Sequence, residues 1–191
     1  MLDVRNKINS LNYFLINLDY KIVLLVMIIG MFLYFGTIFF VFIPTEAILI
    51  NHGYSIFDFQ MSWYYQNTDN ILQNWSGVLD VAVYQTLMDY FFIIGGMLFL
   101  GSIYILSIKL TSIQRLRSFL LIGFWLVDIG ALSDAVENVF SLLIFLDPQN
   151  YPSSFEFFMT FLATVKFFIL PVEYGILILV ILLILFQKLQ R

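Results

Sequence analysis

Three polar residues interrupt a long apolar stretch of the chain: Asp134, Glu137 and Asn138. Residues three and four apart lie on the same face of an α-helix, so these side chains project together. A carboxylate that faces hydrocarbon is costly, and this face must therefore look toward protein or water. Two acids and an amide in such a place have the chemistry to transfer protons, to bind a cation or to hold a buried ion pair.

Lys166 is the expected partner of these acids, because it is the one basic residue inside an apolar segment. Asp89 lies in a third segment, with Gln85 on the same helix face. At a helical rise of about 1.5 Å per residue, the polar positions of all three segments fall at similar depth. We therefore predict one site, and the residues that would bind a ligand there are Asp89, Asp134, Glu137, Asn138 and Lys166.

Acidic residues outnumber basic ones inside the apolar segments. Such a set cannot be fully ionised in a low dielectric, so some carboxylates carry protons, or a cation or a water-filled cavity compensates them. Two of them, Asp128 at mid-depth and the deeper Glu173, are expected to lie apart from the predicted site. The five acids that face the single Lys166 are Asp89, Asp128, Asp134, Glu137 and Glu173.

Two interpretations of the site remain open at this stage. In the structural one, Lys166 bridges Glu137 or Asp134, and Asn138 supplies further hydrogen bonds, so that the cluster only fixes how two helices pack. In the functional one, protonatable carboxylates in a cavity serve acid–base chemistry, proton coupling or the binding of a cationic ligand.

The composition is that of an integral membrane protein. The chain is 61% hydrophobic and 12% charged, against about 45 to 50% apolar and 25% charged residues in soluble domains, and its mean hydropathy is +0.93. It has no cysteine and a single histidine, His52, which excludes thiolate metal sites and bis-histidine haem. We predict no metal, no cofactor and no nucleic-acid partner.

The apolar segments predict an all-α, antiparallel four-helix bundle, with residues 1–191 as a single membrane domain. Each predicted span reaches the length of about 20 residues that a crossing requires. The predicted spans are residues 22–43, 83–108, 118–146 and 155–186.

The outer loop is predicted over residues 44–82. The first span is expected to end at Pro44, and an amphipathic helix over residues 68–82 is expected to begin with N-cap chemistry at Thr68. The aromatic residues Trp63, Tyr64, Tyr65 and Trp75 in this loop are amphipathic, as is typical of side chains at the membrane surface, so the loop is expected to lie on the membrane.

Basic residues predict the topology. None occurs in residues 44–82 or in the turn at 147–154, so these segments face outward and both termini are cytoplasmic, in a protein of the cell membrane. The basic residues of the other side are Arg5, Lys7, Lys21, Lys109, Arg115, Arg117, Lys188 and Arg191.

Three short motifs resemble an uncharacterised family of small four-helix prokaryotic membrane proteins. They are Met88–Phe92, which contains an Asp-Tyr pair, the Asp-x-x-Glu-Asn motif within Ser133–Asn138, and the lysine that ends Thr164–Lys166. The resemblance covers about residues 55 to 170 and implies the four-helix fold. It implies no activity, and it singles out the same five residues as a set.

A more distant similarity is to the sterol-isomerase and sigma-2-receptor superfamily. Its helical bundles hold a lipidic ligand against buried carboxylates, which is an analogy at the level of the fold. This chain lacks the histidine that the isomerase pattern would require.

The function that we favour at this stage is non-catalytic. The buried polar cluster would support the bundle and bind a lipid or small amphiphile, with membrane lipids as partners and a homo-oligomer as a possible assembly. One alternative is a small membrane enzyme for a lipidic substrate, with Glu137 or Asp134 as acid or base and Lys166 holding a carboxylate ionised. Another is a proton-coupled transporter that works as an oligomer.

Overall fold

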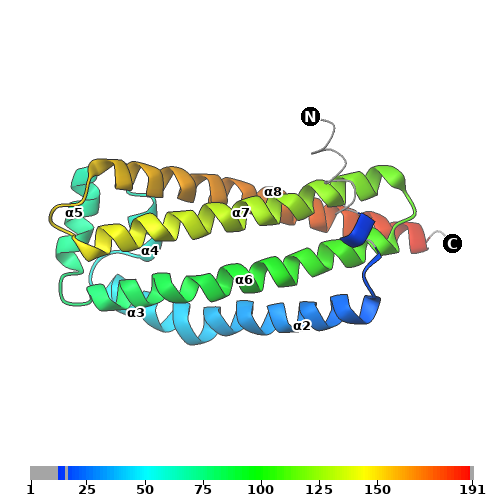
Figure 1. The fold of residues 1–191 in the computed structure, drawn as a ribbon, viewed down its shortest axis with the longest axis horizontal. Helices are drawn as coiled ribbons and strands as arrows, with labels where there is room; N and C mark the ends of the chain where they lie inside the picture. Colours follow the sequence, from blue (N-terminus) through cyan, green and yellow to red (C-terminus); the bar gives the residue numbers. More distant parts are fainter. Residues whose placement is uncertain (1–12, 16, 190–191) are drawn as a thin grey trace.

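A computed structural model describes residues 13–15 and 17–189 of the chain, and in that part every regular element is helical (Figure 1). Four long helical segments are each long and apolar enough to cross a membrane, so the predicted all-α bundle is confirmed. The first is α2 (Tyr20–Thr37), continued by a π-helical turn, η1 (Ile38–Phe42), and by α3 (Ile43–Asn51); the others are α6 (Leu79–Leu110), α7 (Gln114–Leu146) and α8 (Ser153–Leu189).

The four segments form an arc. α2 packs on α6, α6 on α7 and α7 on α8, whereas α2 and α8 hardly touch. α2 begins and α8 ends at the same end of the bundle, which we call the terminal end (Figure 1). The opposite end is covered by α4 (Ile56–Gln60) and α5 (Tyr65–Asn74), and we call it the capped end. The arc therefore has one open side, between α2 and α8.

The prediction that the first span ends at Pro44 is wrong. The helical segment continues to Asn51. Pro44 is the second residue of α3 and lies two residues after the end of the π-helical turn, where the regular hydrogen-bond register is already interrupted. The Thr45 hydroxyl donates to the Val41 carbonyl at 2.8 Å, which helps to satisfy the backbone around the proline. The outer loop is shorter as a result, and Glu46 belongs to the bundle.

The amphipathic loop helix also has other bounds than the predicted 68–82. α5 ends at Asn74, and a turn separates it from α6. This turn allows Trp75 to enter the core of the capped end, where it is fully buried beside Phe59. Thr68 is not an N-cap but a buried residue inside α5, whose hydroxyl donates to Glu156 at 2.8 Å.

The short helix α4 is held in the capped end by aromatic packing. Phe59 is fully buried and stacks on Phe145 of α7 with ring centroids 4.8 Å apart. The next residue is Gln60, so this packing fixes a polar side chain beside α7.

Glycines bring α2 and α6 into direct backbone contact. A Cβ atom on Gly30 would collide with the Phe99 backbone, and one on Gly95 would lie 2.5 Å from the Tyr34 nitrogen. Small residues at such crossings are typical of helix packing in membranes. The close seam between these helices forms one wall of the site described below.

Three of the basic residues that predict the topology, Arg5, Lys7 and Arg191, lie outside the described residues. Lys109, Arg115 and Arg117 lie at or next to the α6–α7 connection, which is at the terminal end.

Candidate functional site

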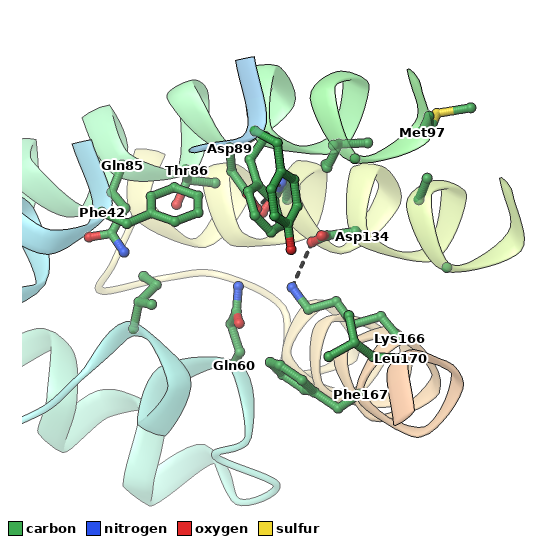
Figure 2. Close-up of a pocket in the computed structure, with 18 of the residues that line it drawn as sticks. Phe42, Gln60, Gln85, Thr86, Asp89, Met97, Asp134, Lys166, Phe167 and Leu170 are labelled. Carbon is green, nitrogen blue, oxygen red and sulfur yellow. Dashed lines mark hydrogen bonds and ion pairs between the residues drawn. The ribbon is translucent and has the colours of Figure 1, made fainter. Parts of the chain in front are cut away.

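Lys166 on α8 forms ion pairs with two acids of α7. Its Nζ lies 2.6 Å from Asp134 Oδ1 and 2.8 Å from Glu137 Oε2 (Figure 2 shows the pair with Asp134). Asp134 and Glu137 are nearly one helical turn apart, so a single ammonium group can bridge them. The structure thus brings the predicted lysine and both predicted acids together.

Glu137 is enclosed on all sides. It is fully buried, and besides Lys166 it accepts hydrogen bonds from Gln60 Nε2 at 3.0 Å and from Ser141 Oγ at 2.7 Å. Three donors on a buried carboxylate compensate most of the hydration that it has lost. Glu137 therefore ties α4, α7 and α8 together.

Asp89 joins the site through Asn138. The Asn138 amide donates to Asp89 Oδ2 at 2.8 Å, from α7 to α6. Both side chains are buried, and the Asn138 Oδ1 atom has no hydrogen-bond partner among the described residues. All five predicted residues thus gather in one region of the bundle.

Two further polar residues extend the site toward the capped end. Gln85, one turn before Asp89 on α6, donates to Glu46 Oε2 of α3 at 3.2 Å. Glu46 also accepts from the backbone nitrogen of Ile56 at 3.3 Å, at the start of α4. The Gln85 Oε1 atom is a second buried oxygen without a partner in the described part of the chain.

A cavity of about 460 Å³ lies against these residues (Figure 2). α2 and α8, which hardly touch elsewhere, supply two of its walls. One residue of each helix meets the other at the end of the cavity farthest from the capped end, where Tyr34 Oη of α2 lies 3.1 Å from Tyr174 Oη of α8. Most of the lining is apolar. The charged and amide side chains in the lining are Glu46, Gln60, Gln85, Asp89, Asp134, Asn138 and Lys166.

Glu137 does not line the cavity, although we had expected a binding pocket to reach it. Lys166 and Asp134 stand between it and the open space, and Gln60 and Ser141 fill its remaining positions. A ligand in the cavity would contact Asp134 and not Glu137.

The two remaining intramembrane acids lie elsewhere. Neither Asp128 nor Glu173 lines the cavity. Glu173 is buried deeper along α8, where its backbone carbonyl accepts a hydrogen bond from Tyr104 at 2.5 Å. Their separation from the site agrees with the depth expected from the sequence.

Glu46 and Gln60 belong to the site but are missing from the sequence prediction. The sequence predicts that Glu46 lies in the outer loop, because Pro44 is a natural end for the first span. Gln60 follows a weak signal, since Ser55 and Asp58 form a capping box that begins α4. That pattern locates a short helix but gives no indication of what it packs against.

Around the cavity, hydrogen-bond acceptors outnumber hydrogen-bond donors. Three carboxylates and two partnerless amide oxygens face one ammonium group. No group of three or more histidine, aspartate or glutamate side chains in the described residues is arranged to hold a metal ion.

Comparison with protein-family models, with curated proteins and with solved structures found no match for this chain. The resemblance to the family of small four-helix prokaryotic membrane proteins therefore stays a prediction.

Proposed function

We propose that this membrane protein binds a lipid or small amphiphile in the cavity between α2, α6, α7 and α8. The supporting observation is a cavity of about 460 Å³ with a group of polar side chains in an otherwise apolar lining, placed between two helices that hardly touch. Small-molecule sites commonly have volumes of about 300 to 1,000 Å³, apolar linings and a few polar groups that orient the ligand. An amphiphile matches both halves of this lining.

The polar wall is what would make such binding specific. An alkyl tail gains little by moving from lipid into the protein, because the two environments are equally apolar. A polar head that enters the bundle can instead form hydrogen bonds and ion pairs in a low dielectric, where they are strong. Selection among amphiphiles therefore depends on Asp89, Asp134, Asn138 and Lys166.

The proposed orientation places the capped end outside the cell and both termini in the cytoplasm of a cell-membrane protein. The positive-inside rule supports it, because residues 44–82 contain no lysine or arginine whereas the α6–α7 connection is basic. The ligand would then come from the outer leaflet.

The geometry favours binding over catalysis. Glu137, a candidate acid or base, does not line the cavity, and Asp134 is held by Lys166 at 2.6 Å. Proton-coupled transport would need a path past the hydroxyl pair of Tyr34 and Tyr174 at the deeper end. Asp134 is thus the acid that an enzymatic mechanism would have to use.

Photolabelling tests this proposal. The protein is placed in phosphatidylcholine nanodiscs with dodecanol that carries a diazirine in its tail, and labelled peptides are mapped. Label is expected on buried apolar residues of the cavity such as Ile93 and Val127, which do not face lipid. Ala131→Phe, which fills the cavity, should abolish that label, whereas Val136→Phe on the exposed face of the same helix should leave it unchanged.

The same pattern of labelling in all three proteins, confined to lipid-facing residues, would contradict the proposal. Thermal unfolding of each variant serves as the control that the bundle is intact.

A further inference from the structure

We infer that the head group that this cavity selects is a primary ammonium group, so that the ligand is a cationic amphiphile with N–H donors. This inference rests on the proposed function and specifies the class of ligand. It follows from the charges in the cavity wall and, independently, from the oxygen atoms that lack donors.

The cavity wall carries more carboxyl groups than cationic groups. Glu46, Asp89 and Asp134 line it, and within residues 13–15 and 17–189 Lys166 is the only lysine, arginine or histidine that does so. The ammonium group of Lys166 is already occupied, because it lies within 2.8 Å of both Asp134 and Glu137. Asp89 and Glu46 therefore face the cavity with amide partners but no cation of their own.

Two buried amide oxygens in the lining have no donor in the part of the chain that the structure describes. They are Asn138 Oδ1 and Gln85 Oε1, on side chains that are 0% and 4% exposed. The amide nitrogens of both residues are already bonded to the carboxylates of Asp89 and Glu46. A buried polar atom without a partner destabilises the protein. The N–H groups of these two amides already donate to carboxylates, so a donor for the two oxygens would have to come from another molecule.

The unsatisfied groups lie along one stretch of the wall. Gln85 and Asp89 are four residues apart on α6, and Asn138 is hydrogen-bonded to Asp89. Figure 2 draws Gln85, Asp89 and Asp134 along one side of the space, with Gln60 and Lys166 on the other. A head group that enters there lies beside the Asp89 carboxylate and beside the two amide side chains whose oxygens lack donors.

Among common head groups, a primary ammonium group fits this arrangement best. It has three N–H donors and no acceptor, and its positive charge compensates Asp89. A carboxylate or phosphate would place a further negative charge beside two acids. A hydroxyl group gives only one donor and no charge, and a quaternary ammonium group has charge but no donor.

A series of amphiphiles with the same tail tests this inference. Dodecylamine, dodecanol and dodecanoate each compete with the diazirine-bearing dodecanol for the protein in phosphatidylcholine nanodiscs. The measured affinities are corrected for the partition of each amphiphile into empty nanodiscs. We expect dodecylamine to bind about tenfold more tightly than dodecanol and dodecanoate to bind most weakly. Dodecyltrimethylammonium, which carries the charge without donors, should rank below dodecylamine.

Variants locate the preference. Asp89→Asn should reduce the advantage of dodecylamine over dodecanol to less than about threefold, because it removes the charge and keeps an acceptor for Asn138. Asp80→Asn is the matched control, since Asp80 is an exposed acid on the same helix and outside the cavity. It should leave the ranking unchanged. If Asp89→Asn fails to fold, the ranking with the wild-type protein decides the question alone.

The outcomes separate this inference from the proposed function. Equal competition by all four amphiphiles, or a preference for dodecanoate, overturns the inference but leaves amphiphile binding in place. Failure of every amphiphile to compete overturns the proposed function, and the inference with it. A preference for dodecylamine that Asp89→Asn does not reduce shows that the amine binds elsewhere, and overturns the inference as well.

Discussion

Asn138 donates its side-chain amide to Asp89 across the α6–α7 interface at 2.8 Å, while its own oxygen atom has no donor in the described chain. The same residue thus holds two helices in register and keeps an unpartnered acceptor buried beside the cavity. The structural and the functional interpretation of the cluster are therefore compatible, because different atoms of one side chain serve each.

Asn138→Leu should destabilise the protein. The change leaves the buried carboxylate of Asp89 without its donor, and a loss of about 1 to 3 kcal/mol in the free energy of unfolding is expected. The double variant Asp89→Leu, Asn138→Leu should recover part of this loss, because both polar partners are then absent. Unfolding followed in detergent micelles measures each value, and a single Asn138→Leu variant as stable as the wild type would contradict the account.

Removal of the largely enclosed Lys166, whose side chain is 12% exposed, should be far more harmful than removal of an exposed lysine. Lys166→Met leaves Asp134 and Glu137 side by side without their cation, and breaking a buried ion pair in this way costs about 3 to 5 kcal/mol. Lys21→Met, at the exposed start of α2, is the control and should have little effect.

Neutralising the acids tests the physical reason. In the triple variant Lys166→Met, Asp134→Asn, Glu137→Gln, no buried charge of the trio remains, and stability should return to within about 2 kcal/mol of the wild type. Melting temperatures in the same detergent compare the three proteins. A triple variant less stable than Lys166→Met would mean that the charges are not what couples these residues.

Adding a single methyl group at the α2–α6 seam should also destabilise the bundle. The new Cβ atom of Gly30→Ala collides with the Phe99 backbone, and overpacking of this kind costs about 1 to 3 kcal/mol. Gly36→Ala, on the same helix with no atom within 4 Å, should be neutral or slightly stabilising because alanine favours helix. Equal effects of the two changes in thermal unfolding would show that the seam is not close-packed.

The hydroxyl of Thr68 should stabilise the capped end. Thr68→Val removes a donor from the buried Glu156, which Thr68 contacts at 2.8 Å, and should cost about 1 to 3 kcal/mol. Thr37→Val is the control, since its hydroxyl only donates within its own helix, to the Leu33 carbonyl. Faster hydrogen exchange of α5 amides is expected in the first variant alone, and unchanged exchange there would refute the role of this contact.

Much of the fold and part of the site could be predicted from the sequence. Apolar length gave four spans, and helical spacing with equal depth placed Lys166 beside Asp134 and Glu137. These inferences succeed because a charged side chain in the hydrocarbon region is costly unless it faces the bundle interior and pairs with another charge. The Asp-x-x-Glu-Asn motif lies within a few residues of the sequence, and α7, which carries it, is a regular helix.

The rest of the site depends on features that spacing does not encode. Glu46 enters the bundle because a π-helical turn lets the first helix continue through Pro44. Gln60 reaches Glu137 because Phe59 anchors a five-residue helix between longer ones. Both depend on tertiary packing around a local exception, which periodicity cannot reveal.

The most direct test of the central claim is an experimental structure of the protein grown from a lipid phase in the presence of dodecylamine. The account predicts elongated density in the cavity, with its head within hydrogen-bonding distance of Asp89 and Asn138 and its tail along Leu170. A cavity filled by protein side chains, or Lys166 turned away from Asp134 toward lipid, would contradict it.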